Sequence, residues 1–424
     1  MRCGAQPDIR GPILLSAYQC GPGMGSVSQI GWEWYRRLAR RVPLTLVTHI
    51  RNRAALVAAG APLAESEILY VDTEWFARPL FLLARRIFPN SEHAVFLLSS
   101  LDFFLFEFMA RRALRRRQAR GQSWELVHVV TPVSPAAVTG LHALRMPLIR
   151  GPLNGHVATP SGFPDLMRED SAWLYPLRSL GYAWDWARGA SRRAARILVA
   201  TRATRHALPP SLREEAIAMP ENGVDPTVFQ IAPWPLPPSP TEPLRLLFVG
   251  RLIPCKALSL LLEAVARCRQ IPIRLRVVGD GPMRAPWEQR MRELHVEDRV
   301  VFVGARSQAE VAEELRETHV FCLPSVRESG GAVLLEAMAV GRPVVAVDWG
   351  GPAELVDDEV GRLVPAHDSE TVVEGLAETF RSVAADPEAW RLRGLAGQKR
   401  AEARYTWEAK IDDALRLYGE VLAV

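Results

Sequence analysis

The sequence predicts an α/β protein made of two domains, each a parallel β-sheet covered by helices. Two observations lead to this fold class. The 424 residues exceed what one hydrophobic core usually serves. Short apolar runs alternate with helical stretches along the whole chain, and 48% of the residues are apolar, which suits ordinary globular packing.

Eleven apolar runs fit buried strands, six in the first half of the chain and five in the second. Those of the first half read PILLSA, PLTLVT, ILYV, ELVHVV, PLIR and RILVA. Those of the second half read LRLLFVG, IRLRVVG, RVVFVG, HVFCLP and PVVAV. Strands of a parallel sheet are covered on both faces, so they are apolar along their length rather than alternately. Each half is therefore predicted to form its own sheet.

A proline-rich segment separates the two halves. Residues 229–243, FQIAPWPLPPSPTEP, resist both helix and central strand because proline lacks an amide hydrogen and fixes φ. We therefore predict a first domain over residues 1–228 and a second over 244–404, joined by this linker. The last helical stretch, 405–424, lies beyond the pattern of the second sheet, and we expect it to pack back on the first domain.

The cysteines and the apolar segments indicate a cytoplasmic protein. The five cysteines are odd in number and form no C-x-x-C pair, which argues against a disulfide framework and against a thiolate zinc site. The first 19 residues hold too short an apolar run for a secretory signal, and no stretch offers the ~18 uncharged apolar residues of a membrane span. We expect a cytoplasmic protein, with peripheral contact to the inner face of the cell membrane as an addition.

Positive charge is concentrated in the first half. Residues 1–225 hold 28 arginines and 18 acidic residues, a net charge of +10, against −5 for the remainder. Residues 96–120, FLLSSLDFFLFEFMARRALRRRQAR, place aromatic and aliphatic residues before six arginines. Two interpretations stay open: a helix lying on an anionic membrane surface, or a core helix with a solvated basic C-terminal end that the helix dipole favours. Asp102 and Glu107 argue against a transmembrane helix.

The first loop of the second half carries cations at the start of a helix. In GRLIPCKALSLLLEA, Gly250 precedes Arg251, and Lys256 comes just before an amphipathic helix. Backbone amides at a helix N-terminus attract anions, and two cations add to this attraction, so the loop predicts a diphosphate site. The chain has two other lysines, Lys399 and Lys410, so Lys256 indicates a need for a compact ammonium group. A surface lysine capping the loop is the structural alternative.

A second loop, RESGGAVLLE, places two acids around a glycine pair. Glu328 lies in the loop, and Glu336 lies on a helix predicted over 332–340. An acid retained in so apolar a stretch usually has a bonding reason, and a carboxylate accepts hydrogen bonds from two neighbouring hydroxyls of a ribose or a hexose. The alternative is that Glu336 pairs with an arginine in the core while Glu328 is solvated.

Together these motifs resemble glycosyltransferase family 4, whose members have the GT-B fold of two Rossmann-like domains and an E-x7-E signature. The resemblance rests on VGRLIPCKALSLLLEA, VVGDGP, LPSVRESGGAVLLEAMAVGRPVVAVDWGGPAELV and GRLVP, in the order of the family through most of residues 220–365. More loosely, AYQCGPGMGSVSQIGWEWYRRLARR is similar to the family's acceptor-side loop and helix, and PENGVDPTVF to the stretch entering its hinge.

The resemblance implies a retaining hexosyltransferase that moves a sugar from a UDP- or GDP-sugar to a hydroxyl without a cofactor or metal. The sequence contains no D-x-D motif. Arg251 and Lys256 would hold the diphosphate, Glu328 would contact the transferred sugar, and Glu336 would bind the nucleotide ribose. Further donor contacts are implied for Gly250, Gly279, Ser329, Gly330, Gly331, Ala332 and Val333, and from the first domain for Gly25 and Ser26. The implied acceptor is a glycan or a lipid-linked molecule of bacterial surface polysaccharide or glycolipid biosynthesis.

The chain departs from the family mainly on the acceptor side. Gly151 stands where the family commonly has a histidine, with His156 a few residues on, and His128 in ELVHVV is a second catalytic candidate. For either histidine a structural or an acceptor-binding role stays open. Ala257 follows Lys256 where the family often has glycine.

Two other functions are weighed against this one. The loop GPGMGS after the first strand approaches the G-x-G-x-x-G fingerprint of dinucleotide-dependent oxidoreductases, but the next strand ends in Thr48 and His49 instead of an acid for the ribose. The sequence pI of about 9.1 suggests a nucleic-acid binder, yet the interleaved aromatic and basic residues of RNA modules are missing. Ligand choice separates the three, and no nucleic-acid partner is expected.

Overall fold

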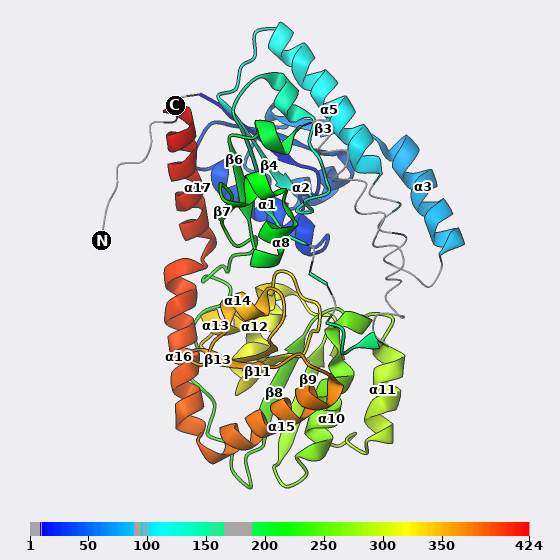
Figure 1. Ribbon diagram of the computed structural model, residues 1–424, viewed down its shortest axis with the longest axis vertical. Helices are drawn as coiled ribbons and strands as arrows, with labels where there is room; N and C mark the ends of the chain where they lie inside the picture. The colour runs from blue at the N-terminus through cyan, green and yellow to red at the C-terminus, as the bar shows by residue number, and fades with distance from the viewer. Residues whose placement is uncertain are drawn as a thin grey trace. The chain divides into compact units, whose positions relative to one another are not determined.

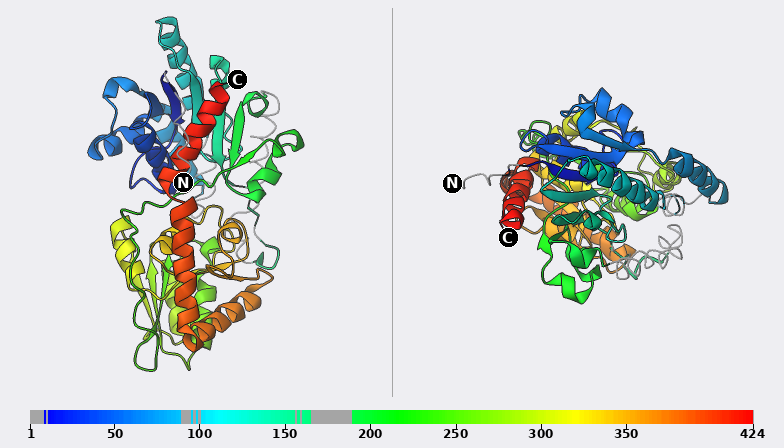
Figure 2. Two further views of the ribbon diagram at one scale, coloured as in Figure 1. Left: turned by 90° about the vertical axis from the view of Figure 1, so that its left-hand side faces the viewer. Right: turned by 90° about the horizontal axis from the view of Figure 1, so that it is seen from above.

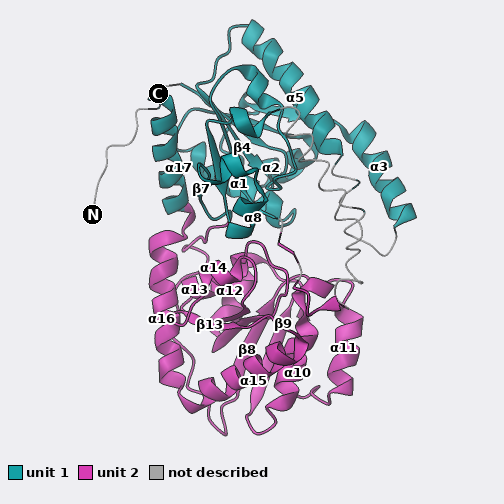
Figure 3. Ribbon diagram, viewed as in Figure 1, with its two compact units in different colours: residues 1–156, 171–221, 408–424 teal, residues 157–170, 222–407 magenta. Residues whose placement is uncertain are grey.

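A computed structural model describes residues 9, 11–88, 95, 98, 101–155, 157–158, 160–164 and 189–423. The chain forms two compact units (Figures 1 and 3). Unit 1 comprises residues 1–156, 171–221 and 408–424, and unit 2 comprises residues 157–170 and 222–407. The C-terminal segment therefore belongs to unit 1, and the linker 229–243 belongs to unit 2.

Unit 1 is built on a seven-stranded parallel sheet with the strand order β3-β2-β1-β4-β5-β6-β7. Its strands are β1 (Ile13–Ala17), β2 (Leu44–His49), β3 (Ile68–Val71), β4 (Leu126–Thr131), β5 (Leu148–Leu153), β6 (Arg196–Val199) and β7 (Ile217–Ala218). The six predicted strands are confirmed. The seventh, β7, escapes prediction because two residues make no apolar run.

Helices cover this sheet and include the C-terminal helix of the chain. They are α1 (Ser26–Leu38), α2 (Arg53–Ala58), α3 (Glu74–Ile87), α5 (Asp102–Ala119), α8 (Arg202–Ala207), α9 (Pro210–Arg213) and α17 (Trp407–Leu422). Tyr418 of α17 is buried, and its hydroxyl lies 2.6 Å from His128 Nδ1. Arg37 of α1 donates to Glu408 at 2.8 Å. The last helix thus packs on unit 1 through its own side chains.

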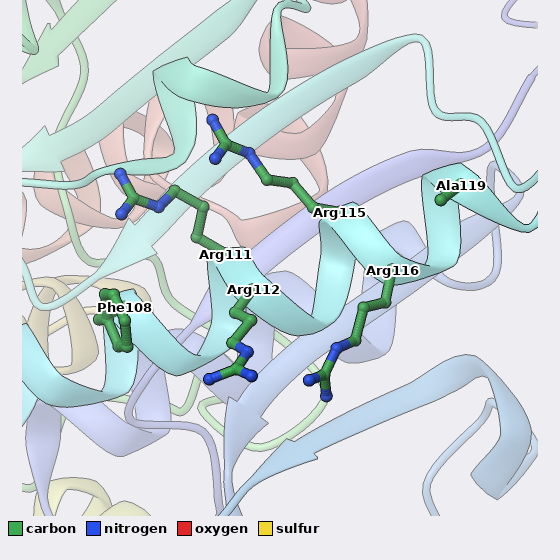
Figure 4. Close-up of a pocket in the computed structure, with 6 residues that line it drawn as sticks. All are labelled: Phe108, Arg111, Arg112, Arg115, Arg116 and Ala119. Carbon is green, nitrogen blue, oxygen red and sulfur yellow. The ribbon is translucent and has the colours of Figure 1, made fainter.

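Residues 96–120, which contain helix α5, were interpreted either as a helix on a membrane surface or as a core helix with a basic end. Its aromatic residues Phe103 and Phe106, with Ala110 and Leu114, are buried in the core of unit 1. The apolar side of this helix is therefore a core face, which was one of the two interpretations. Of its arginines, Arg112, Arg115 and Arg116 are exposed (Figure 4). Within the described residues no helix has the length and apolar character needed to cross a bilayer.

Unit 2 is built on a six-stranded parallel sheet with the order β10-β9-β8-β11-β12-β13. The strands are β8 (Leu244–Val249), β9 (Ile273–Val278), β10 (Val300–Gly304), β11 (Val320–Leu323), β12 (Val344–Val347) and β13 (Gly361–Val364). The helices are α10 (Leu258–Arg267), α11 (Arg284–Glu293), α12 (Gln308–Arg316), α13 (Ala332–Ala339), α14 (Pro352–Leu355), α15 (Ser369–Ala385) and α16 (Pro387–Arg404). The five predicted strands and the helix predicted over 332–340 are confirmed. The short β13 completes the sheet.

The linker forms neither helix nor strand, as its prolines predict, but it is firmly attached to unit 2. The Trp234 indole donates to the His319 carbonyl at 3.0 Å. His319 Nε2 donates in turn to the Leu236 carbonyl at 2.8 Å, and the guanidinium of Arg342 donates to the Pro233 carbonyl at 2.8 Å. A segment without its own secondary structure is thus held by side chains of the neighbouring elements.

Candidate functional site

Both sheets reverse their strand order at one point, and the loops that follow the strands at that point are where ligands bind in open α/β sheets. In unit 2 the reversal lies between β8 and β11. The loop after β8 contains Arg251 and Lys256, and the loop after β11 contains Glu328 and the glycine pair. The topology therefore brings together the two loops that the sequence singles out.

The backbones of these loops are tied to one another and to the neighbouring loop after β9. Val326 N donates to the Cys255 carbonyl at 3.1 Å, which links the loop after β11 to the loop after β8. Gly279, at φ 136°, lies so close to Gly250 that a Cβ at residue 279 would collide with the Gly250 carbonyl. The close approach explains why the sequence has glycine there.

Lys256 ends a short 3₁₀ turn, Pro254–Lys256, directly before α10. The next residue, Ala257, has φ 47° and ψ 38°, a left-handed conformation that favours glycine. This conformation gives a physical reason for the glycine that the resembled family often has at this place. The turn directs the Lys256 side chain back over Gly250, whose Cα region it approaches.

Lys256 and Glu328 form an ion pair. Both side chains are mostly buried, with 17% and 14% of their surfaces exposed. Burial and the charge of Arg251 would lower the pKa of Lys256, but the Glu328 carboxylate outweighs them and raises it above its ordinary value. Burial would likewise raise the pKa of Glu328, and Lys256 lowers it below its ordinary value. Both groups are therefore charged at neutral pH.

The Glu328 carboxylate also faces the amides that open α13. The backbone N–H groups of Gly330 and Gly331 lie 3.4 Å from its second oxygen, at the outer limit of a hydrogen bond. Gly331 is the N-cap of α13, in a left-handed conformation with φ 65°. Ser329 lies in the same loop, and Ala332 and Val333 form the first turn of the helix. One ammonium and two amides thus converge on a single carboxylate.

Glu336 lies one turn further along α13, and the surroundings of its carboxylate differ from those of Glu328. Among the residues that the structure describes, no hydrogen bond or ion pair reaches its carboxylate. Burial raises its pKa from the usual range of a glutamate to about 7. The alternative in which Glu336 pairs with an arginine is therefore not found in the described part of the chain.

The loop after β12, DWGG, supports the Glu328 loop from the other side, and sequence reasoning did not assign this role. Gly351 N donates to the Glu328 carbonyl at 2.9 Å. A Cβ at Gly350, where φ is 68°, would collide with that same carbonyl. Two consecutive glycines after a buried strand were the available signal, since they allow one backbone to lie against another.

We expect Gly350→Ala to weaken binding of the ligand of this site by displacing the Glu328 loop. Gly60→Ala is the matched control, because Gly60 has φ 66° and a Cβ there would meet nothing within 4 Å. Both variants should lose about 1 kcal/mol of unfolding free energy to the left-handed backbone, and Gly350→Ala should lose more because its Cβ would also collide with the Glu328 carbonyl. Isothermal titration with the ligand should show weakened binding for Gly350→Ala and unchanged binding for Gly60→Ala. Equal affinities would show that the glycine contact does not position Glu328.

The two candidates in unit 1 have different environments. Gly25, at φ 99°, is the N-cap of α1, and Ser26 is its first residue, directly after the loop that follows β1. His128 lies in β4 and is fully buried: Nε2 donates to the Gly151 carbonyl at 2.7 Å, and Nδ1 lies 2.6 Å from the Tyr418 hydroxyl. Burial lowers its pKa to about 4. This corrects the expectation of a catalytic role for His128, because its ring is neutral, enclosed and engaged at both nitrogens. His156 lies outside the described residues.

Two parallel sheets with this strand order, the second carrying cations and acids at its reversal point, define the GT-B class. Residues 237–390, about a third of the chain, match the family described as Glycosyl transferases group 1. The matched residues lie in unit 2, and over them the chain is similar to a family of glycosyltransferases, in line with the resemblance that the sequence motifs carry.

The similar proteins agree with this assignment. The D-inositol 3-phosphate glycosyltransferase of Stackebrandtia nassauensis is 35% identical over 216 residues, which are 47% of this chain and 48% of that protein. The putative colanic acid biosynthesis glycosyltransferase WcaL of Escherichia coli is 38% identical over 176 residues, 38% of this chain and 42% of that protein. The chain thus spans about half the length of the curated relatives it matches. The structure of Anabaena HepE in complex with UDP covers 97% of this chain and 100% of its own, with a TM-score of 0.62 at 16% identity, which shows the fold alone.

Proposed function

We propose that the protein is a retaining, metal-independent hexosyltransferase that takes its sugar from a UDP- or GDP-sugar. The observation that carries the proposal is Glu336, a half-buried carboxylate with no hydrogen bond or ion pair among the described residues, next to a lysine–glutamate pair at the reversal point of the sheet. A partly desolvated carboxylate that has no protein partner can accept hydrogen bonds from a ligand. The vicinal hydroxyls of a ribose supply two such bonds.

In this proposal Lys256 and Arg251 act on the leaving group. As the bond between the anomeric carbon and the diphosphate breaks, negative charge develops on the departing nucleoside diphosphate. The ammonium group, the guanidinium group and the amides at the start of α13 stabilise that charge where it forms. Glu328 contacts the transferred sugar through the carboxylate that these groups now surround.

The acceptor is proposed to be a hydroxyl of a glycan or of a lipid-linked molecule. The support comes from the relatives: one is named for D-inositol 3-phosphate and another for colanic acid biosynthesis. D-inositol 3-phosphate bears hydroxyl groups, and both names describe glycosyltransferases.

A thermal-shift panel tests the donor class. We expect UDP and UDP-sugars, or GDP and GDP-mannose, to raise the melting temperature, since a ligand at about 100 times its Kd adds about 2.7 kcal/mol of stability. NADH and a single-stranded oligonucleotide serve as the probes for the rival functions. A shift by NADH alone would overturn the proposal and direct attention to the glycine loop after β1. Retention is checked separately, by the anomeric configuration of the first product formed.

A further inference from the structure

We propose that a segment from the first half of the chain positions Glu328 for the sugar that this residue contacts. The segment, called the Phe163 segment, comprises residues 157–158 and 160–164. The inference rests on the proposed function, in which Glu328 contacts the transferred sugar, and it names the residues that hold Glu328 in place. The Phe163 segment belongs to none of the sequence motifs of the donor site.

The Phe163 segment is part of unit 2, although its place in the sequence predicts that it belongs to the first domain. Strand β5 of unit 1 ends at Leu153, and the chain enters unit 2 at Val157. Phe163 is 2% exposed and lies in the hydrophobic core of unit 2. Burial of a whole phenylalanine side chain removes a large apolar area from water, so this residue fixes the segment to unit 2.

Two loops at the carboxyl edge of the unit 2 sheet hold the Phe163 segment. In the loop after β12, the Trp349 indole donates to the Ala158 carbonyl at 2.6 Å. In the loop after β13, the His367 carbonyl lies so close to Gly162 that a Cβ on this glycine would collide with it. Strands β12 and β13 are neighbours, so the segment lies across the edge from one loop to the next. Figures 1 and 2 show this blue-green segment beside the start of α15, which is orange.

Val157 brings the Phe163 segment against the loop that carries Glu328. A Cβ placed on Gly350 would lie 3.0 Å from the Val157 side chain and 2.3 Å from the Glu328 carbonyl. Gly350 is therefore enclosed between the segment and the Glu328 backbone. On either side of it, Trp349 donates to the segment, and Gly351 donates to the Glu328 carbonyl at 2.9 Å. Three consecutive residues thus connect the segment to Glu328.

The loop of Glu328 needs support from outside because its own backbone is permissive. Gly330 and Gly331 follow Glu328, and glycine has more conformational freedom than any other residue. A side chain that contacts a ligand is effective when packed neighbours hold it to within about 0.5 Å. The Phe163 ring and the Trp349 indole are such neighbours, since one is buried in the core and the other is hydrogen-bonded to the segment.

A purely structural role of the segment would stabilise unit 2 and affect every ligand alike. A positioning role affects ligands differently, because only a sugar nucleotide carries the group that Glu328 contacts. In the proposed function Arg251 and Lys256 bind the diphosphate, and Glu336 binds the ribose. Displacement of Glu328 should therefore weaken the binding of a sugar nucleotide and leave that of a nucleoside diphosphate unchanged.

Hydrogen–deuterium exchange of the full chain without ligand provides the first test. Gly162→Ala pushes the segment away from the loop after β13, and Trp349→Phe keeps a ring but removes the hydrogen bond to the segment. We expect the amides of Gly330, Gly331 and Gly351 to exchange at least about tenfold faster in both variants, since a loop without its support opens more often. Wild-type exchange rates in both variants would overturn the proposal.

Isothermal titration with UDP-glucose, GDP-mannose, UDP and GDP provides the second test. Both variants should bind the sugar nucleotide at least about tenfold more weakly, because small displacements of a positioned group have large effects. They should bind the nucleoside diphosphate within about twofold of the wild-type affinity, since groups without shared partners act independently. Equal losses for the two kinds of ligand, or no loss, would overturn the proposal. Absence of binding by the wild type would overturn the proposed function, and the exchange rates would then decide the support of the loop alone.

Matched controls change the same kinds of contact elsewhere in unit 2. Gly394→Ala places a Cβ against the Gly341 carbonyl, and Trp234→Phe removes the indole hydrogen bond to the His319 carbonyl. Both controls should keep the wild-type exchange rates and affinities. The double variant Gly162→Ala, Trp349→Phe should lose no more affinity than the weaker-binding single variant, because both changes release the same segment. Equal effects in test and control variants would overturn the proposal.

Discussion

Replacement of Lys256 by methionine is expected to abolish nucleotide diphosphate binding and to lower kcat/KM by about 10³-fold or more. Methionine keeps the shape of the side chain and removes the charge that would face the diphosphate in the ground state and in the transition state. It also leaves the Glu328 carboxylate mostly buried without its cation. Breaking a buried pair in this way costs about 3 kcal/mol of unfolding free energy. Calorimetric titration and denaturant unfolding measure the two effects.

Lys399 provides the control, because it is exposed and is one of the two other lysines of the chain. Lys399→Met should bind nucleotide and unfold like the wild type. The double variant Lys256→Met, Glu328→Gln should recover most of the lost stability, since the buried charge is gone, without recovering binding. Nucleotide binding by folded Lys256→Met at wild-type affinity would contradict the assigned role of the lysine.

Replacement of Glu336 by glutamine is expected to raise the free energy of unfolding at alkaline pH and to weaken ligand binding. The pKa of Glu336 is raised to about 7, above that of a glutamate in the unfolded chain. Between pH 4.5 and 7 the folded state therefore holds more protons than the unfolded state, so stability falls as pH rises through this window. Glutamine does not ionise, so the variant does not lose stability as the pH rises. Glu336→Gln should be more stable than the wild type at pH 8, by up to about 3 kcal/mol, and similar to it at pH 4.5.

The same carboxylate should make donor affinity depend on pH. If a ribose is bound by the ionised form, affinity for the sugar nucleotide rises about tenfold from pH 6 to pH 8 as a group of pKa 7 loses its proton. A sugar nucleotide is the right probe, because its diphosphate does not titrate over this range. Glu336→Gln should bind more weakly with a flat profile, and Glu297→Gln, at an exposed glutamate, should retain the wild-type profile. A flat profile in the wild type would show that the carboxylate does not bind the ligand.

The sequence predicts the sheets and the donor loops because their signals are local. Apolar runs specify the strands, and the spacing from Lys256 to α10 and from Glu328 to α13 specifies two loops that follow strands. The strand order then brings these loops together at the reversal point. Strand β7 was missed because two residues give too short a run, and β13 was missed because its first two residues, Gly361 and Arg362, leave only two consecutive apolar residues.

Contacts between residues far apart in the sequence could not be predicted in the same way. The partner of Lys256 is 72 residues away, and the partner of His128 is 290 residues away on the last helix. Sequence reasoning therefore took His128 as a catalytic candidate, although its ring is enclosed between the Gly151 carbonyl and the Tyr418 hydroxyl. It also left open that the aromatic part of residues 96–120 faces outward, whereas Phe103 and Phe106 are buried in the core of unit 1.

In the ion pair of Lys256 and Glu328, the Glu328 carboxylate occupies the place that the anionic group of a ligand would take, so it competes with that ligand. The ammonium group and the two glycine amides already have an anion in their midst, which is tethered to the same loop and present at high effective concentration. A free inorganic phosphate has to displace this anion with no other contact to offset the exchange. In the proposed function a sugar nucleotide brings a ribose for Glu336 and a sugar for Glu328 itself, so the displaced carboxylate gains a new partner. On that proposal the ion pair sets a minimum affinity, which the complete donor exceeds and which inorganic phosphate does not reach.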